Sequence, residues 1–237
     1  MKNPAQGEMM IKSQKIFILI IVVCTLPFLK ISNAQTTDFR LRTGVKIQKE
    51  FSKKFDASIE YELRFDNNLT KFDQTLIEPS VSYNVAKPLT IGAEWRFMYE
   101  QDLKRRISYK QRGAFFLRFK KSFGDFDFKL KTAIQYGFDD LTNTDLNNHK
   151  KIINRNSLSV DYNWFGSKLT PFAGYEFFYH INNPNGGIIN QSRLKLGTSY
   201  RFSKASEFSA YYIFENEFNI ANPVDANIVG FAYSYKF

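Results

Sequence analysis

Charged side chains of both signs recur at every second position over long stretches of this sequence. Successive side chains of an extended strand point to opposite faces, so this spacing gathers the charges on one face. Rows of such residues on neighbouring strands can form a rigid ion-paired network, or they can line a narrow passage that prefers anions. The positions predicted to share this charged, lumen-facing side are Arg40, Arg42, Glu60, Glu62, Arg64, Glu94, Arg96, Arg112, Arg118, Lys129, Arg193 and Lys195.

Hydrolysis is the enzymatic chemistry that the sequence leaves open. The chain has two histidines, His149 and His180. A lipid hydrolase needs a serine nucleophile, a histidine that takes its proton, and a polar group that orients the histidine. Glu176 shares a predicted face with His180 and could orient it, but no serine stands beside His180 in the sequence. We therefore expect no catalytic residues and no enzyme, with a lipid hydrolase that uses His180 as an alternative.

No residue spacing typical of a cofactor or metal centre is present. The single cysteine, Cys24, lies in an N-terminal apolar run, so residues 35–237 have no thiol for a disulfide or a metal site. Glycine-rich phosphate loops are also missing. Asp139, Asp140 and Asp145 could together hold a calcium ion, although Asp and Asn in a polar loop more often serve as turn residues. The sequence therefore predicts neither a cofactor nor a bound metal.

The N-terminal residues have the order of a secretory signal. Lys12 and Lys15 precede an apolar run over residues 16–29, and the small residue Ala34 follows. The run is shorter than the roughly 20 residues of a spanning helix. We predict a cleaved signal peptide at residues 1–34 and one β-domain at residues 35–237.

A net charge of +10 raises the question of an acidic partner. No basic run or base-stacking motif indicates nucleic acid, so we expect none to bind. Anionic lipid headgroups are the expected partner instead.

From Phe39 to the end, apolar and polar residues alternate in segments separated by tight turns or polar loops. The segments have about 10–13 residues, whereas ordinary strands average about 5–6. Strands of this length, tilted, cross the ~25 Å apolar band of an outer membrane. The pattern predicts an all-β, antiparallel transmembrane barrel with short periplasmic turns and longer extracellular loops. Aromatic residues that suit the membrane interfaces lie near segment ends: Tyr83, Tyr99, Trp164 and Tyr179.

The number of strands is less certain than the fold class. Eleven segments can be counted, yet bacterial single-chain barrels have an even number of strands. We expect 10–12 strands and favour twelve or ten. Either residues 35–45 hold a further strand, or one segment does not join the wall. The longest loop is predicted at residues 139–156.

Two polar residues interrupt the apolar face that should meet lipid. They are Lys49 and Gln111, and both lie close to a predicted turn or loop. A lysine costs about 2–4 kcal/mol at the bilayer midplane but only about 0–1 kcal/mol near the interface. We therefore expect both side chains at the membrane interface.

The chain ends in a segment with one continuous apolar and aromatic face. We predict that this strand carries the assembly signal of an outer-membrane barrel and that the barrel assembly machinery recognises it. The expected location is the outer membrane of a Gram-negative-type bacterium, where the protein would be a monomer surrounded by lipid. The residues of the signal are Phe231, Tyr233, Tyr235 and Phe237.

Six short runs share a hairpin pattern, and they lie at residues 51–55, 60–65, 78–83, 91–96, 218–223 and 230–237. Together these runs resemble a family of secreted barrel-like proteins catalogued as domain of unknown function 2490. The resemblance covers essentially residues 35–237 and implies a barrel, but it implies no activity and no site residues.

Three functions follow from these patterns. We favour a non-enzymatic outer-membrane barrel with a structural, binding or narrow-channel role. Ten to twelve strands enclose far less space than the 16–18 of a porin, so free diffusion of large solutes is not expected. The alternatives are the lipid hydrolase and a soluble periplasmic β-sandwich that binds a ligand, because a sandwich also has one apolar and one polar face per strand.

Overall fold

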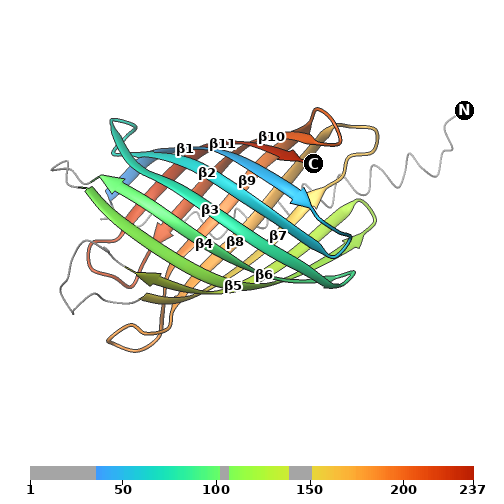
Figure 1. Ribbon diagram of the computed structural model, residues 1–237. Coiled ribbons are helices and arrows are strands. Elements are labelled where there is room, and N and C mark those ends of the chain that lie inside the picture. The colour runs from blue at the N-terminus through green and yellow to red at the C-terminus, as the bar shows by residue number, and fades with distance from the viewer. Residues whose placement is uncertain (1–35, 102–106, 139–150) are drawn as a thin grey trace, which may run out of the picture.

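The computed structural model describes residues 36–101, 107–138 and 151–237, in which eleven strands form one closed barrel (Figure 1). The predicted signal peptide at residues 1–34 lies outside the described residues. The strands are β1 (Thr36–Glu50), β2 (Phe55–Asp66), β3 (Lys71–Ala86), β4 (Leu89–Gln101), β5 (Ile107–Phe123), β6 (Phe126–Phe138), β7 (Lys151–Tyr162), β8 (Leu169–His180), β9 (Ile188–Arg201), β10 (Ser206–Glu217) and β11 (Val224–Lys236).

The barrel closes through a parallel pairing of its first and last strands. Each strand pairs antiparallel with its neighbour in the chain, but β1 pairs with β11 in parallel, from Thr36 opposite Val224 to Gln48 opposite Lys236. The preference for ten or twelve strands was therefore wrong. An even number follows only when the closing pair is antiparallel. All eleven segments join the wall, and residues 36–50 form a single strand.

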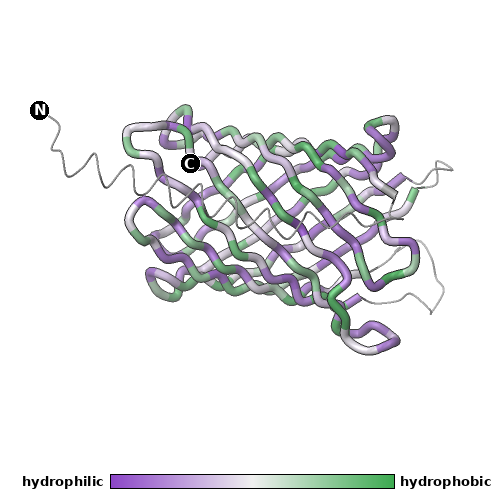
Figure 2. The backbone as a smooth tube through the Cα atoms, turned by 180° about the vertical axis from the view of Figure 1, so that it is seen from behind, coloured by the Kyte–Doolittle hydropathy of each residue, from purple (hydrophilic) through white to green (hydrophobic). Residues whose placement is uncertain are grey.

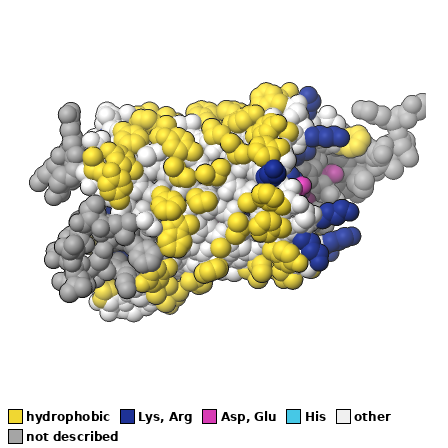
Figure 3. Space-filling model, in the orientation of Figure 1, with side chains coloured by type: hydrophobic (Ala, Val, Ile, Leu, Met, Phe, Trp, Pro, Cys, Tyr) yellow, Lys and Arg dark blue, Asp and Glu magenta, His cyan; other side chains and the backbone are white. Residues whose placement is uncertain are grey.

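One continuous sheet also excludes the β-sandwich, because a sandwich needs two sheets packed face to face. The predicted faces hold along the strands, where hydrophilic and hydrophobic residues alternate (Figure 2). The apolar residues lie outside, and many of the largest are at least 40% exposed, including Ile59, Val81 and Leu158. Space-filling shows these side chains spread over the outer wall (Figure 3).

The two mouths of the barrel differ. At the mouth that we call the turn end, the chain reverses at residues 51–54, 87–88, 124–125, 163–168 and 202–205, and Phe237 lies there too. The reversal between β5 and β6 has two residues because Gly124 adopts a φ of +57°, which glycine reaches without strain. In the view of Figure 3, lysine and arginine side chains gather at this end.

The opposite mouth, the loop end, carries the remaining connections and the start of β1. One boundary there differs from the prediction, because β7 begins at Lys151 and the loop predicted at residues 139–156 is shorter. Its last residues are already strand. Asn154 and Asn156 face outward and bond to each other, and Asn154 also donates to the Thr132 hydroxyl oxygen (3.3 Å). Because these two asparagines occupy outward positions where apolar residues are expected, the alternation of apolar and polar residues that indicates a strand is interrupted there.

Candidate functional site in the barrel lumen

The structure places the charged residues predicted to face the lumen on the inner side of the wall. Arg40 pairs with a carboxylate of β10, Lys129 pairs with Asp161 of β7, and Arg112 is half-buried with its Nη2 atom buried. The remaining ones surround an internal cavity. They are Arg42, Glu60, Glu62, Arg64, Glu94, Arg96, Arg118, Arg193 and Lys195.

Glu215 is the centre of the densest ionic contacts. Its side chain is 3% exposed and receives three guanidinium groups, from Arg40 (3.1 Å), Arg42 (3.6 Å) and Arg193 (2.5 Å). We call these four residues the Glu215 cluster. They come from β1, β9 and β10. β1 and β10 flank β11 at the parallel closure, and β9 is the next strand beyond β10. The cluster thus ties together the strands on both sides of the seam.

Further pairs extend the cluster around the wall. Arg193 also reaches Glu176 (3.9 Å), which holds Arg155 more closely (2.6 Å). Beside them, Arg64 pairs with Glu62 (2.5 Å).

Apolar side chains fill the space next to these pairs. Ile213, Ala226 and Ile228 pack together inside the wall and are 6%, 0% and 0% exposed. We call the Glu215 cluster with these ionic and apolar neighbours the lumen plug. Glu215 lies two residues before β10 ends and Ala226 two residues after β11 begins, so the plug occupies the loop-end half of the barrel.

A cavity of about 380 Å³ lies between the plug and the turn end, and we call it the lumen cavity. Ser58, Ser209 and Ser234 line it, each within three residues of a strand end at that mouth. The other lining side chains include nine basic and five acidic ones. The lumen cavity therefore has an excess of positive charge.

Most charges in the lumen cavity are paired. Lys131 contacts Glu94 (2.8 Å), and Arg96 contacts Glu78 (2.5 Å). Within the described part of the chain, four lining side chains have no ion-pair partner within 4.0 Å. These four are the cations of Lys46, Arg118 and Lys195 and the carboxylate of Glu60.

Aromatic rings on the inner wall hold several of these cations. The Lys195 ammonium lies 3.8 Å from the centre of the Tyr211 ring, and Arg118 lies 5.1 Å from that of Phe116. Each ring lies close to a glycine of the adjacent strand, Tyr211 to Gly230 and Phe116 to Gly92, where a Cβ would sit 2.1 Å and 2.3 Å from ring atoms. The sequence analysis missed these rings. The signal that could have found them is an aromatic residue in a polar row opposite a glycine.

The geometry around His180 does not assemble a hydrolase site within the described residues. Glu176, the expected orienting group, is engaged by Arg155 and Arg193. His180 instead hydrogen-bonds Asn182, and the residues opposite it on the neighbouring strands are Ile153 and Ile188. Neither of these two strand neighbours carries a hydroxyl group that could act as a nucleophile.

The two polar residues predicted on the lipid face have local partners. The Trp95 indole N–H donates to the Gln111 side-chain oxygen (3.1 Å). The Lys49 ammonium lies 5.5 Å and 5.8 Å from the ring centres of Phe51 and Phe237 at the turn end. Both contacts keep a polar group satisfied beside an apolar surface.

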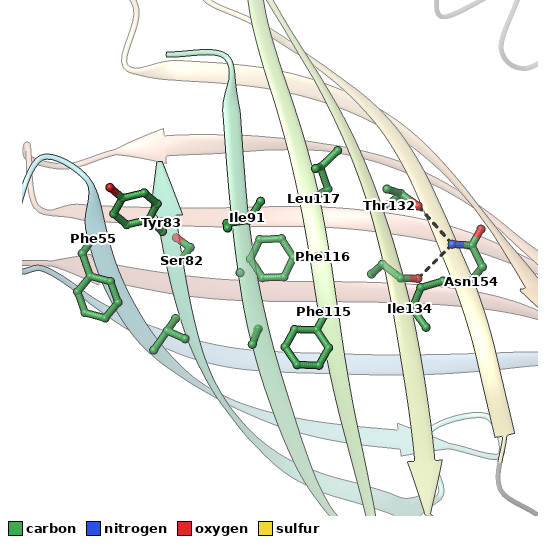
Figure 4. A pocket seen from close by; sticks show the side chains of 14 residues that line it. Phe55, Ser82, Tyr83, Ile91, Phe115, Phe116, Leu117, Thr132, Ile134 and Asn154 are labelled. Atoms are coloured by element: carbon green, nitrogen blue, oxygen red, sulfur yellow. Dashed lines mark hydrogen bonds between the residues drawn. The ribbon is translucent and has the colours of Figure 1, made fainter. Parts of the chain in front are cut away.

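The outer wall also has a shallow groove of about 580 Å³ across β2 to β7 (Figure 4). Its lining is mainly apolar, with Phe115, Leu117 and Ile134 among the labelled side chains, and Phe115 is 76% exposed. Thr132 and Asn154 supply the hydrogen bond at its edge.

Within the described ranges, no group of three or more His, Cys, Asp or Glu side chains could hold a metal ion. The aspartates considered for calcium, residues 139, 140 and 145, lie outside those ranges. The described residues also contain no helix with the length and apolar character needed to span a bilayer.

A closed β-barrel with an apolar outer face and a charged interior is the architecture of the barrels that span membranes. Within that class, the chain matches the family described as "Protein of unknown function (DUF2490)" over residues 39–227, and it belongs to this family. No curated protein matches the chain.

Solved structures with partial similarity include two of OmpT, an outer membrane protein of Vibrio cholerae. The in-vitro folded trimer form has 13% identity and a TM-score of 0.39, covering 72% of this chain and 58% of that chain. The form expressed in the outer membrane has 14% identity and a TM-score of 0.38, with coverages of 73% and 61%. The chain thus spans about three fifths of the length of each.

Proposed function

We propose that this protein is a non-enzymatic barrel of the outer membrane of a Gram-negative-type bacterium, with a structural or binding role and a lumen closed to solutes. The observation that carries the proposal is the Glu215 cluster, which fixes three arginines on one buried carboxylate along the inner wall from β9 to β1. In a water-filled porin channel, such charged side chains would be solvated by water. The cluster instead supports a rigid, closed interior.

The outer face supports the membrane location. Its exposed apolar residues suit hydrocarbon, and the outward Phe231, Tyr233, Tyr235 and Phe237 of the final strand suit recognition by the barrel assembly machinery. In the proposed orientation the turn end faces the periplasm and the loop end faces outside. The protein would act as a monomer in contact with outer-membrane lipids.

Conductance in planar lipid bilayers tests the closed lumen. The folded chain should insert, as heat-modifiable migration on semi-native gels would report, and should show no sustained conductance steps. Sustained steps would refute the closed lumen. If those steps prefer anions, as the nine basic and five acidic lining residues suggest, the narrow-channel alternative replaces it.

Phospholipid turnover tests the non-enzymatic part of the proposal. Wild-type protein and the His180→Ala variant should both leave detergent-dispersed phospholipid intact, because His180 is bonded to Asn182 and faces isoleucines. Turnover by the wild type that disappears in His180→Ala would establish the hydrolase alternative.

A further inference from the structure

The three unpaired cations of the lumen cavity are spread around the barrel wall. Lys46 lies on β1, Arg118 on β5 and Lys195 on β9. Around the closed sheet, three strands separate β1 from β5, three separate β5 from β9, and two separate β9 from β1. The three side chains therefore approach the lumen from three sides, which is how a tripod of donors surrounds a central anion.

The positions of two of these cations are fixed by aromatic rings. Lys195 lies between Tyr211 (3.8 Å) and Phe172 (5.5 Å), and Arg118 lies on Phe116 (5.1 Å). A cation held on a ring face loses little further freedom when an anion arrives. Charge-assisted hydrogen bonds from such groups are also about twice as strong as neutral ones.

Hydroxyl groups and size complete the environment. Ser58 bonds Ser80 (2.8 Å) and Ser209 bonds Ser199 (2.7 Å) on the turn-end side of the cations, where each pair has hydroxyls that can turn toward a ligand. The volume of about 380 Å³ is within the ~300–1,000 Å³ typical of small-molecule sites. The basic side chains at the turn end would raise the local concentration of anions at this mouth.

We propose that the lumen cavity binds a small multivalent oxyanion, a polycarboxylate or a phosphorylated compound, through Lys46, Arg118 and Lys195. The ligand enters at the turn end because the lumen plug fills the loop-end half. Entry from the periplasm rests on the orientation in the proposed function, whereas the chemistry of the site does not.

Calorimetric titration of the detergent-folded chain at low salt tests the site, with inorganic pyrophosphate and citrate as the two probes. Saturable binding of either probe is expected. Lys195→Met should weaken it about tenfold or more, because one charge-assisted contact is lost. Glu60→Gln should strengthen it, because the unpaired carboxylate that repels the anion is removed. Lys204→Met, at the exposed 202–205 turn, makes the same change of charge outside the cavity and should weaken binding far less than Lys195→Met, because it removes long-range attraction but no contact with the anion.

The comparison of probes identifies the chemical class of the ligand. Binding of pyrophosphate alone indicates a phosphorylated compound, binding of citrate alone indicates a polycarboxylate, and binding of both indicates a site that accepts either class. Each variant is first checked for the heat-modifiable band, so that lost binding is not lost folding. No saturable binding by folded wild type, or equal weakening in Lys204→Met and Lys195→Met, would overturn the proposal. This outcome is independent of conductance: a conducting barrel that binds refutes the closed lumen only, and a silent barrel that does not bind refutes the anion site only.

Discussion

Replacing Glu215 by glutamine keeps the size of the side chain and removes the charge on which three arginines converge. Arg40 retains Asp38 at 2.7 Å, and Arg193 retains Glu176 at 3.9 Å. Arg42 has no other carboxylate within 4.0 Å among the described residues, and it is only 8% exposed. The substitution therefore leaves one buried guanidinium without a counter-charge.

The expected loss of stability follows from that burial. Removing one partner of a buried ion pair costs about 3–5 kcal/mol, whereas an exposed pair contributes about 0–1 kcal/mol. We expect Glu215→Gln to lower the free energy of unfolding by an amount in the first range. The Glu215→Gln/Arg42→Met double variant should recover most of the loss, because it removes the unpaired charge together with its partner.

Urea unfolding in a fixed detergent, followed by the fraction of heat-modifiable band, measures both variants. Glu207→Gln is the matched control on the same strand. Glu207 pairs with Arg201 at 3.7 Å, and their side chains are 34% and 60% exposed, so its loss should cost about 1 kcal/mol or less. Equal, small losses in Glu215→Gln and Glu207→Gln would refute the rigid plug and indicate a lumen whose charges are solvated by water.

Two further predictions concern the wall. Leu41 and Val229 lie opposite each other across the parallel seam, so cysteines at these two positions should form a disulfide in the folded chain without residues 1–34. Cysteines at Leu41 and Tyr233 should not form one, because these positions are about 13 Å apart. Electrophoretic mobility without reductant reports the cross-link. Gly230→Ala should lower the free energy of unfolding by about 1–3 kcal/mol, because its Cβ would lie 2.1 Å from the Tyr211 ring.

Each of these predictions has a contrasting outcome. Equal cross-linking of both cysteine pairs would contradict the register of the seam. For the glycine, Gly137→Ala is the control, since its Cβ would lie 3.7 Å from the nearest atom. Urea unfolding should place Gly137→Ala close to wild type, and Tyr211→Ala should relieve the effect of Gly230→Ala. Additive losses in that double variant would mean that the ring does not press on the glycine.

The barrel and its two faces could be predicted because alternation is a local property of each strand. The charge of Glu60 and the apolar side chain of Ile59 each indicate the face of the strand on which the residue lies. The strand count could not be settled in the same way. Whether β1 meets β11 in parallel depends on contacts between the two ends of the chain, and no local pattern records the direction of that pairing.

The contacts between side chains inside the lumen also could not be predicted from the alternation of polar and apolar residues. Alternation placed Arg42 and Arg193 in charged rows, but it could not show that the strand register sets Arg193 opposite Glu215 or that Arg42 reaches the same carboxylate from β1, on the other side of β11. Arg155 was hidden because the asparagines on either side of it made residues 151–156 look like a loop. The alternation pattern did not indicate a role for Tyr211, because it does not show that an aromatic residue in a polar row can occupy the space above a glycine of the next strand.

The parallel seam has a consequence for how the protein is made. Until β1 meets β11, both strands expose a row of unpaired backbone amides and carbonyls, and each such group costs several kcal/mol in hydrocarbon. Because β11 is synthesised last, no shorter chain can close the same ring. The earlier strands must therefore be shielded from lipid and from one another until β11 is available to pair with β1. Truncation within β11 should accordingly abolish insertion altogether, since a barrel with an open edge has no stable place in the bilayer.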